Sequence, residues 1–241
     1  MNVDKAETPN APEAHASSMP RDELASNLAG NEDLALALLK NRDLSAEHLE
    51  GIHKNAAVMK SRKVRLALAA HPRAPRRIAL RLIREFYTFD LMHFSLMSAA
   101  PADLRRTASE LLVTRLSSIT LGERISLARR SSALVAGALL LDKKSQVWKP
   151  ALENARLTED AIVKALRRPH VTPAFVESVC RHVKWSVPHE IRIALLRNAH
   201  TPLARALEFA RSIPPARLRD ILHSSRLPEN IKAYLRKELR G

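Results

Sequence analysis

Arginines recur at a helical spacing between residues 75 and 86, and among the residues of this chain they are the best suited to binding chemistry. At roughly 3.6 residues per turn, their side chains fall within about 140° on a helical wheel and form one ridge. The ridge consists of Arg76, Arg77, Arg81 and Arg84. Guanidinium groups bind phosphates and carboxylates through two parallel hydrogen bonds. Because no acidic residue except Glu85 is near them in the sequence, we predict a polyanion-binding ridge; the alternative is an ordinary solvated helix face.

Basic residues outside this segment extend the candidate site. Three of them are counted with the ridge as polyanion-binding candidates, namely Arg73, Arg105 and Arg106. Other basic pairs are dispersed along the chain and include Arg129-Arg130, Lys143-Lys144 and Arg167-Arg168. In a protein built from repeats, equivalent positions line one face, so these pairs are expected to merge into a basic stripe.

Residue types that commonly carry catalysis or bind metals form no recognisable motif. Cys180 and His182 lie two residues apart, a spacing at which side chains on a helix point to different sides. We therefore interpret Cys180 as a buried structural thiol. His189-Glu190 lacks the second histidine that a zinc peptidase helix requires. Since the chain has only five glycines, phosphate-binding glycine loops are not expected either, and we predict no metal, no cofactor and no catalytic residue.

Aromatic residues are few, and they cluster next to the ridge. Four of them lie within nine positions, at Phe86, Tyr87, Phe89 and Phe94. Together with neighbouring leucines and methionines they are predicted to pack in the core. Platforms that stack the bases of single strands use more aromatic side chains than this, so reading of bases is not expected.

The ridge needs a helix to carry it, and the sequence favours helices from about Asp22 onward. Glycines are rare, and apolar residues recur at spacings of three and four rather than two. Several prolines open such periodic segments, where a fixed φ angle and a missing N–H group are tolerated. These prolines are Pro75, Pro173, Pro202 and Pro228.

A corner between helices is repeated along the chain. The segment Arg65-Leu-Ala-Leu-Ala-Ala-His-Pro-Arg-Ala-Pro75 matches Arg192-Ile-Ala-Leu-Leu-Arg-Asn-Ala-His-Thr-Pro202 position by position in Arg, Ala and Leu. Weaker copies centre on Asn41, Asn154, Pro169 and Ser224, and two degenerate copies are expected near residues 99–103 and 131–134. Helix caps are predicted at Ser45, Thr158, Thr172 and Thr201, with Leu44 and Leu157 as hydrophobic staples.

The pattern Arg-x-Ala-Leu-x-x-[Asn/His]-x-x-[Thr/Ala]-Pro resembles the corners of variant leucine-rich and HEAT-like (armadillo-type) repeat proteins. This resemblance implies an all-α fold, a right-handed solenoid of short helix-turn-helix repeats that presents a binding surface. It covers six corners and is absent from about residue 87 to 146. We expect one solenoid domain over residues 21–241, preceded by a disordered tail at residues 1–20 that is poor in large apolar side chains.

Composition bears on the size of the core, on the cellular compartment and on membrane insertion. The chain has 241 residues, 46% of them hydrophobic, which is enough for a core without disulfides. Its single cysteine is typical of a reducing compartment, and we predict the cytoplasm. The longest apolar run, residues 133–141, is too short for a transmembrane helix.

The formal net charge of +15 draws phosphate polymers, anionic membranes or acidic proteins at long range. The first hypothesis is a non-catalytic module that binds nucleic acid through its phosphates. The alternative is a scaffold for an acidic protein partner. A further alternative follows from the resemblance, because HEAT-like alkylpurine DNA glycosylases combine a basic solenoid with tryptophan and carboxylate groups. Trp148 and Trp185 are present, although no motif of that family is matched.

Overall fold

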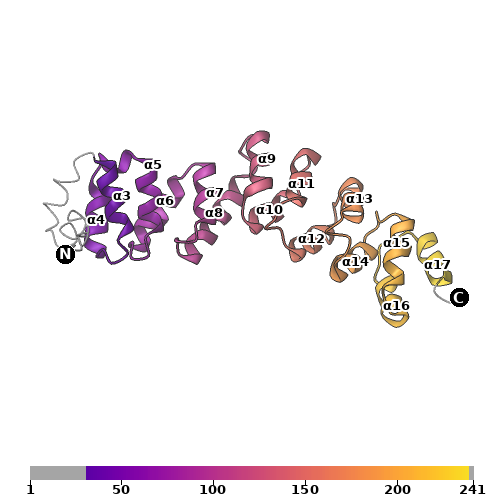
Figure 1. Ribbon diagram of the computed structural model, residues 1–241. Coiled ribbons are helices and arrows are strands. Elements are labelled where there is room, and N and C mark those ends of the chain that lie inside the picture. The colour runs from indigo at the N-terminus through magenta and orange to yellow at the C-terminus, as the bar shows by residue number, and fades with distance from the viewer. Residues whose placement is uncertain (1–30, 239–241) are drawn as a thin grey trace, which may run out of the picture. The chain divides into compact units, whose positions relative to one another are not determined.

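The computed structural model describes residues 31–238, so the predicted tail at residues 1–20 and the helix start near Asp22 lie outside the described part. Within it the chain forms fifteen α-helices and one short 3-10 helix, with no β-strand (Figure 1). The protein is therefore all-α. The helices up to residue 115 are α3 (Glu32–Lys40), α4 (Ala46–Lys54), η1 (Val58–Lys60), α5 (Arg62–Ala70), α6 (Arg76–Glu85), α7 (Thr88–Leu96) and α8 (Ala102–Arg115).

The remaining helices are equally short. They are α9 (Leu121–Arg130), α10 (Ala133–Leu139), α11 (Ser145–Leu152), α12 (Glu159–Leu166), α13 (Pro173–Arg181), α14 (His189–Leu196), α15 (Leu203–Arg211), α16 (Pro215–His223) and α17 (Glu229–Glu238). None of the helices that the structure describes is long and apolar enough to cross a membrane.

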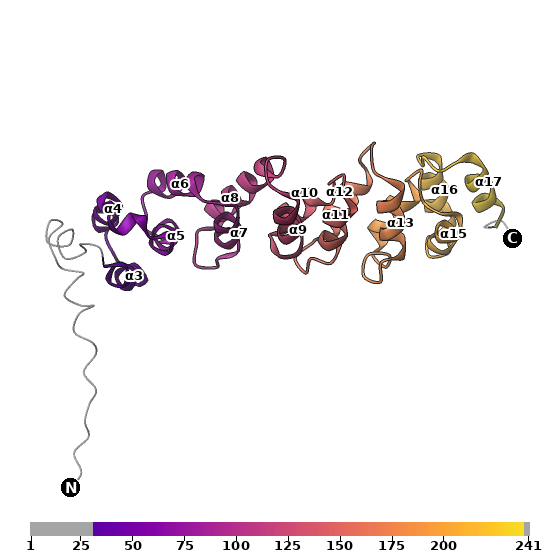
Figure 2. The same ribbon diagram turned by 90° about the horizontal axis from the view of Figure 1, so that it is seen from above.

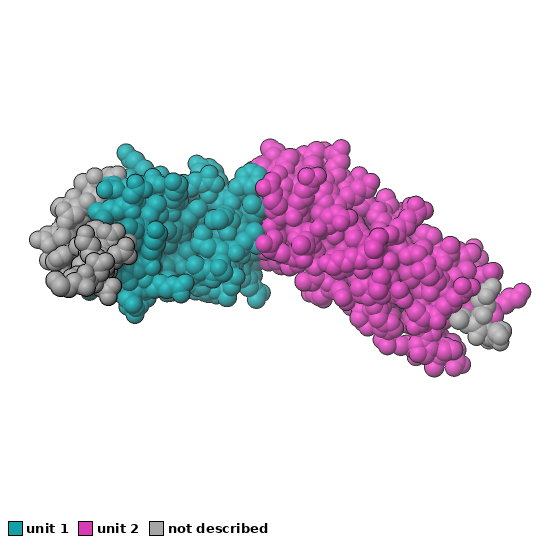
Figure 3. Space-filling view, in the orientation of Figure 1, with its two compact units in different colours: residues 1–115 teal, residues 116–241 magenta. Residues whose placement is uncertain are grey.

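The chain divides into two compact units (Figure 3). Unit 1 ends at Arg115 and unit 2 begins at Leu116. This boundary falls within residues 87–146, the segment in which the repeated corner could not be found in the sequence. Helical corners are nevertheless present there, between α7 and α8 and between α9 and α10, where the two degenerate copies were expected.

Helices within each unit mainly contact their neighbours along the chain, which is consistent with a repeat-like arrangement. In unit 1, α5 packs against α3, α6 and α7, and α6 packs against α8. In unit 2, α12 lies between α10 and α14, and α14 contacts α16, while α9 contacts α11. Alternate helices thus form two layers within a unit, as Figure 2 shows for α4, α6 and α8 against α3, α5 and α7.

Side chains at the corners explain why the helices begin where they do. Ser45, Thr158 and Thr172 are N-cap residues whose hydroxyl oxygens accept a main-chain N–H group three residues later, so these three predicted caps are confirmed. The prediction for Thr201 is wrong. Pro202 occupies the cap position, and the Thr201 hydroxyl instead donates to the carbonyl oxygen of Leu195 at 2.6 Å.

The corners also share hydrogen bonds that tie one helical pair to the pair before it. The Asn198 amide oxygen accepts the N–H of His200 at 3.0 Å, while its Nδ2 donates to the carbonyl oxygen of Leu166 at 2.9 Å. Asn154 makes the same two kinds of bond, and its Nδ2 reaches the carbonyl oxygen of Ala128 at 2.8 Å. Both asparagines are buried, so each satisfies a helix-end carbonyl that no water could reach.

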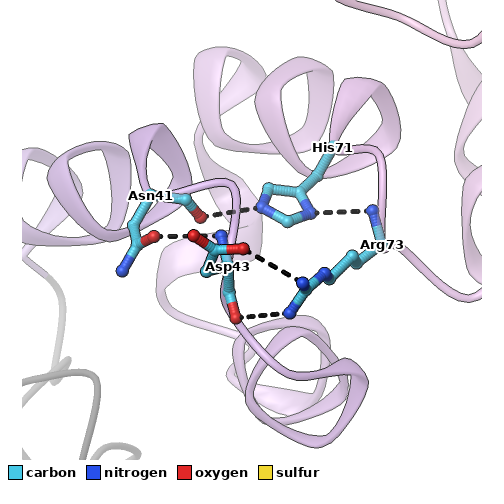
Figure 4. A network of polar contacts seen from close by, with 4 residues as sticks. All are labelled: Asn41, Asp43, His71 and Arg73. Atoms are coloured by element: carbon cyan, nitrogen blue, oxygen red, sulfur yellow. Dashed lines mark hydrogen bonds and ion pairs between the residues drawn. The ribbon is translucent and has the colours of Figure 1, made fainter.

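Histidine and serine replace asparagine at other corners. His71 Nδ1 accepts the N–H of Arg73 at 3.2 Å, and Nε2 bonds the carbonyl oxygen of Asn41 at 3.0 Å (Figure 4). Because Nδ1 accepts, the proton of the neutral ring lies on Nε2. Ser225 Oγ donates to the carbonyl oxygen of Leu196 at 2.6 Å. The partners are separated by 30 and 29 residues respectively, which is about the spacing of the repeated corner.

Candidate polyanion-binding sites

Helix α6 presents the predicted arginine ridge to solvent. The opposite face of the helix is buried and consists of Ile78, Ala79, Leu82 and Ile83. The four ridge arginines are all exposed, and Arg77 and Arg81 keep 77% and 73% of their side-chain surface accessible. The helical-wheel arrangement is therefore confirmed. Whether the ridge binds a polyanion stays a prediction.

Carboxylates surround the ridge more closely than its local sequence indicated. Arg77 Nη2 lies 2.6 Å from Glu50 Oε1, and Arg76 is ion-paired with Asp103. Both carboxylates are 27 residues away in sequence, so the local sequence, in which Glu85 is the acidic neighbour, does not reveal them. Arg81 Nε also lies 3.4 Å from Glu85 Oε1. Three of the four ridge arginines are thus ion-paired with a carboxylate.

Arg84 differs from the other three ridge arginines, because no described carboxylate pairs with its exposed side chain. The ridge also acts on His53 of α4, which is partly buried beside it. Burial and the nearby Arg81 guanidinium hold the pKa of His53 below its ordinary value. The neutral form of this histidine is therefore favoured beside the ridge.

The other three predicted site residues are not equivalent. Arg73 binds Asp43 twice, with Nη2 3.0 Å from the carboxylate Oδ1 and Nη1 2.8 Å from the carbonyl oxygen (Figure 4). Arg106 Nε lies 2.8 Å from Glu110 Oε1, one turn along α8. Arg105 is partly buried, and its Nε is enclosed without a hydrogen-bond partner in the described structure. Arg73 therefore links its own corner to the corner that contains Asp43. The side chain of Arg105 is partly enclosed between packed helices.

The aromatic cluster beside the ridge is only partly core. Phe86 and Phe94 are buried and their rings lie 5.8 Å apart, as predicted. Tyr87 and Phe89, in contrast, are 70% and 41% exposed, so the prediction is wrong for them. Tyr87 is the N-cap residue of α7, a position that leaves its ring outside the helix packing.

Unit 2 contains a pocket that the sequence did not single out as a site, and we call it the arginine pocket. Its volume is about 320 Å³. Four arginines and one histidine line it, namely Arg167, Arg168, Arg197, Arg226 and His200. They come from the corners that follow three alternate helices, α12, α14 and α16. Among the described residues of its wall, none is acidic.

The arginines of this pocket differ from those of the ridge in their surroundings. All four are exposed, and none forms an ion pair with a carboxylate in the described part of the chain. Because like charges repel, such a group is stabilised by any anion that enters. A signal was present in the sequence: Arg168 precedes Pro169, Arg197 precedes Asn198, and Arg226 follows Ser225, so each stands beside a corner residue.

A second pocket adjoins the first, and we call it the apolar pocket. It has a volume of about 290 Å³ and shares Arg168, Pro169 and Val171 with the arginine pocket. Its wall is completed by Leu140, Leu141, Asp142, Trp148, His170, Thr172 and Phe175. Trp148 and Phe175 meet edge to face, with ring centroids 5.5 Å apart. An apolar cavity therefore lies directly beside a strongly basic one.

The chain matches no known protein family, curated protein or solved structure. The function must therefore be argued from the two pockets and the ridge.

Cys180 and Trp185 are held in structural roles. Cys180 is fully buried, and burial raises the pKa of its thiol to about 11. The thiol thus stays protonated near neutral pH, in agreement with a structural role. Trp185 is also buried, and its Nε1 donates to the carbonyl oxygen of Leu152 at 2.8 Å. Residues 31–238 bring together no group of three side chains suited to holding a metal ion.

Proposed function

We propose that the chain is a right-handed α-solenoid, similar to HEAT-like and variant leucine-rich repeat proteins, that binds nucleic acid without catalysing a reaction. The architecture is supported by the sequential contacts between short helices. It is supported further by corner hydrogen bonds such as that from Asn198 to Leu166, which join partners about one repeat apart.

The observation that carries the proposal is the arginine pocket. Its four arginines stand without carboxylate partners in the described structure, so their donors are available to a ligand. Guanidinium groups match phosphate oxygens geometrically and form charge-assisted hydrogen bonds with them. Contacts of this kind position a nucleic acid without reading its sequence. Arg84 of the ridge offers a further contact of the same kind in unit 1.

The decisive experiment measures the affinity of the whole chain for a labelled oligonucleotide by fluorescence anisotropy at two salt concentrations. Phosphate contacts release counterions, so the affinity is expected to fall about tenfold or more between about 50 and about 200 mM salt. Absence of binding, or an affinity independent of salt, contradicts the proposal.

A charge reversal assigns the binding to the pocket. Arg197→Glu places a carboxylate among three arginines and is expected to weaken binding about tenfold. Arg211→Glu is the matched control, because Arg211 is an exposed arginine of α15 that does not line the pocket. It is expected to change affinity by about twofold at most. Equal losses for the two variants indicate a diffuse charge effect instead.

An acidic protein partner is the competing interpretation, and the same variants distinguish it. If the chain binds an acidic polypeptide such as polyglutamate but no oligonucleotide, and Arg197→Glu abolishes that binding, the scaffold function is correct.

A DNA glycosylase is the second candidate, because Trp148 and Asp142 line the same pocket as Arg168. The Asp142 carboxylate is already engaged, since it is ion-paired with Arg124 and accepts the N–H of Lys144 at 2.8 Å. Release of an alkylated base from DNA by the wild type, but not by Asp142→Asn, is the result that establishes this activity.

A further inference from the structure

The two pockets of unit 2 differ in chemistry but share one wall. Arg168, Pro169 and Val171, from the corner between α12 and α13, contribute to both. A ligand that fills both pockets therefore needs a strongly anionic part and a flat or apolar part joined by a short link. A nucleotide has this construction, because its sugar links a phosphate to an aromatic base.

The arginine pocket is better matched to a terminal phosphate than to one inside a strand. An internal phosphodiester carries one charge and two free oxygens, whereas a phosphomonoester carries nearly two charges and three strong acceptor oxygens. The four arginines that line this pocket exceed what a single diester can pair with. A strand end also needs only one route out of a pocket, whereas an internal phosphate needs two.

The apolar pocket offers a surface for the base attached to that phosphate. The exposed part of its wall consists of Leu141, Pro169 and the imidazole ring of His170, whereas Trp148, Phe175 and Leu140 belong to the buried core beneath the pocket and are only 2–3% exposed. Bases gain affinity from such contacts whatever their identity, because every base has a π face. The one acidic side chain in this wall, Asp142, is offset by its ion pair with Arg124. It therefore does not oppose a phosphate held on the arginine side.

We infer that the two pockets together bind the phosphorylated end of a nucleic-acid strand, with the terminal phosphate in the arginine pocket and its base in the apolar pocket. This inference rests on the proposed nucleic-acid binding. It goes further, because it names a preferred position on the strand. The dispersed basic residues elsewhere on the chain account for binding along the strand but give no preference for an end.

The test compares three single strands of identical sequence, about ten nucleotides long and labelled at an internal position. One carries a 5′-phosphate, one a 3′-phosphate and one hydroxyl groups at both ends. The whole chain is expected to bind one of the phosphorylated strands about tenfold more tightly than the hydroxyl strand. Affinities equal within about twofold overturn the inference while leaving nucleic-acid binding intact, whereas absence of binding to all three overturns both.

Two leucine variants test the position of the base. Leu141→Asp introduces a charge into the apolar pocket, and Leu134→Asp is the matched control outside it. Both leucines are already exposed, by 40% and 47%, so neither change removes a core side chain. Leu141→Asp is expected to weaken binding of the preferred phosphorylated strand about fivefold or more, and Leu134→Asp about twofold at most. Equal effects of the two variants overturn the placement of the base.

A competitor determines whether the ligand must be a nucleotide. A nucleoside monophosphate is expected to displace the phosphorylated strand at a lower concentration than a phosphoserine peptide, because only the nucleotide occupies both pockets. Displacement by the peptide at the same or a lower concentration overturns the inference and identifies a general phosphomonoester site.

Discussion

Arg77 and Arg197 are both exposed arginines, yet their electrostatic surroundings differ. Arg77 lies 2.6 Å from Glu50, whereas Arg197 shares a pocket with three further arginines and no described acidic residue. An anion approaching Arg77 must compete with a carboxylate that is already in place. An anion approaching Arg197 instead relieves repulsion. Exposure alone is thus a poor guide to which arginine binds a ligand.

The first prediction concerns the ridge. The double variant Arg77→Glu/Arg81→Glu is expected to weaken oligonucleotide binding, but by less than the single Arg197→Glu change, because the ridge carboxylates already offset part of its charge. Helicity measured by circular dichroism should stay nearly unchanged, since both side chains face solvent. A larger loss of affinity in the ridge variant than in Arg197→Glu contradicts this ranking.

The second prediction concerns the buried thiol. Burial, which outweighs the nearby Arg205 guanidinium, raises the pKa of Cys180 to about 11, so the folded chain holds the thiol proton to higher pH than the unfolded chain does. The free energy of unfolding should therefore fall as pH rises from about 8.5 toward about 11. Urea denaturation at several pH values measures this. Cys180→Ser serves as the control, because a serine hydroxyl does not titrate in this range. If the free energy of unfolding falls with pH equally steeply in the wild type and in Cys180→Ser, the prediction is contradicted.

At the scale of the elements, the corners decide where each helix begins and how helical pairs are joined. Ser45, Thr158 and Thr172 cap helices as their sequence context predicts, because capping depends on residues within one turn. The Glu50 and Asp103 partners of the ridge could not be predicted in this way, since each lies 27 residues from its arginine. Local pattern thus predicts the helices, while the charge of the site depends on how helices pack.

The arginine pocket likewise could not be predicted from local sequence pattern. Arg168, Arg197 and Arg226 stand next to residues of three different helical corners, and only the packing of those corners brings them to one pocket. The signal for this pocket lies in the position of each of these arginines beside a corner residue and not in the pattern of any one helix face. The aromatic prediction failed at Tyr87 for a related reason, because a cap position leaves a ring outside the core.

The third prediction tests a corner hydrogen bond. Asn154→Ala removes the donor to the carbonyl oxygen of Ala128 and the acceptor for the N–H of Arg156, both in a buried corner. The free energy of unfolding is expected to fall by about 1–3 kcal/mol in urea denaturation. Gln146→Ala, at an exposed position of α11, is the control and should change it by about 0.5 kcal/mol at most. A loss at Asn154 no greater than that at Gln146 contradicts a stabilising role for the corner.

At the scale of the whole molecule, stability should be distributed along the chain rather than shared by one core. Helices contact mainly their neighbours, and each of the two compact units has its own buried side chains. In such arrangements, damage at one place is felt by the adjacent helices first.

The fourth prediction follows from this distribution. Leu195→Ala removes a fully buried side chain of α14 and is expected to speed amide hydrogen exchange in α12 to α16 while leaving α5 to α8 nearly unchanged. Leu91→Ala, at an equally buried position of α7, should show the reverse pattern. Mass spectrometry of the exchanged whole chain measures both. Uniform acceleration along the chain in either variant contradicts this picture and indicates a single cooperative structure.

The bonds that join successive corners also bear on how such a gene can change length. The bond from Asn198 reaches Leu166, 32 residues earlier, and the bond from Ser225 reaches Leu196, 29 residues earlier, so each needs only a helix end one repeat back. An in-frame tandem duplication of one such segment would supply both partners of a new bond. It would also add another arginine beside the new corner. The number of such segments can therefore be changed by duplication without altering any individual side chain. Evolution or a protein engineer could in this way adjust how strongly this surface holds anions.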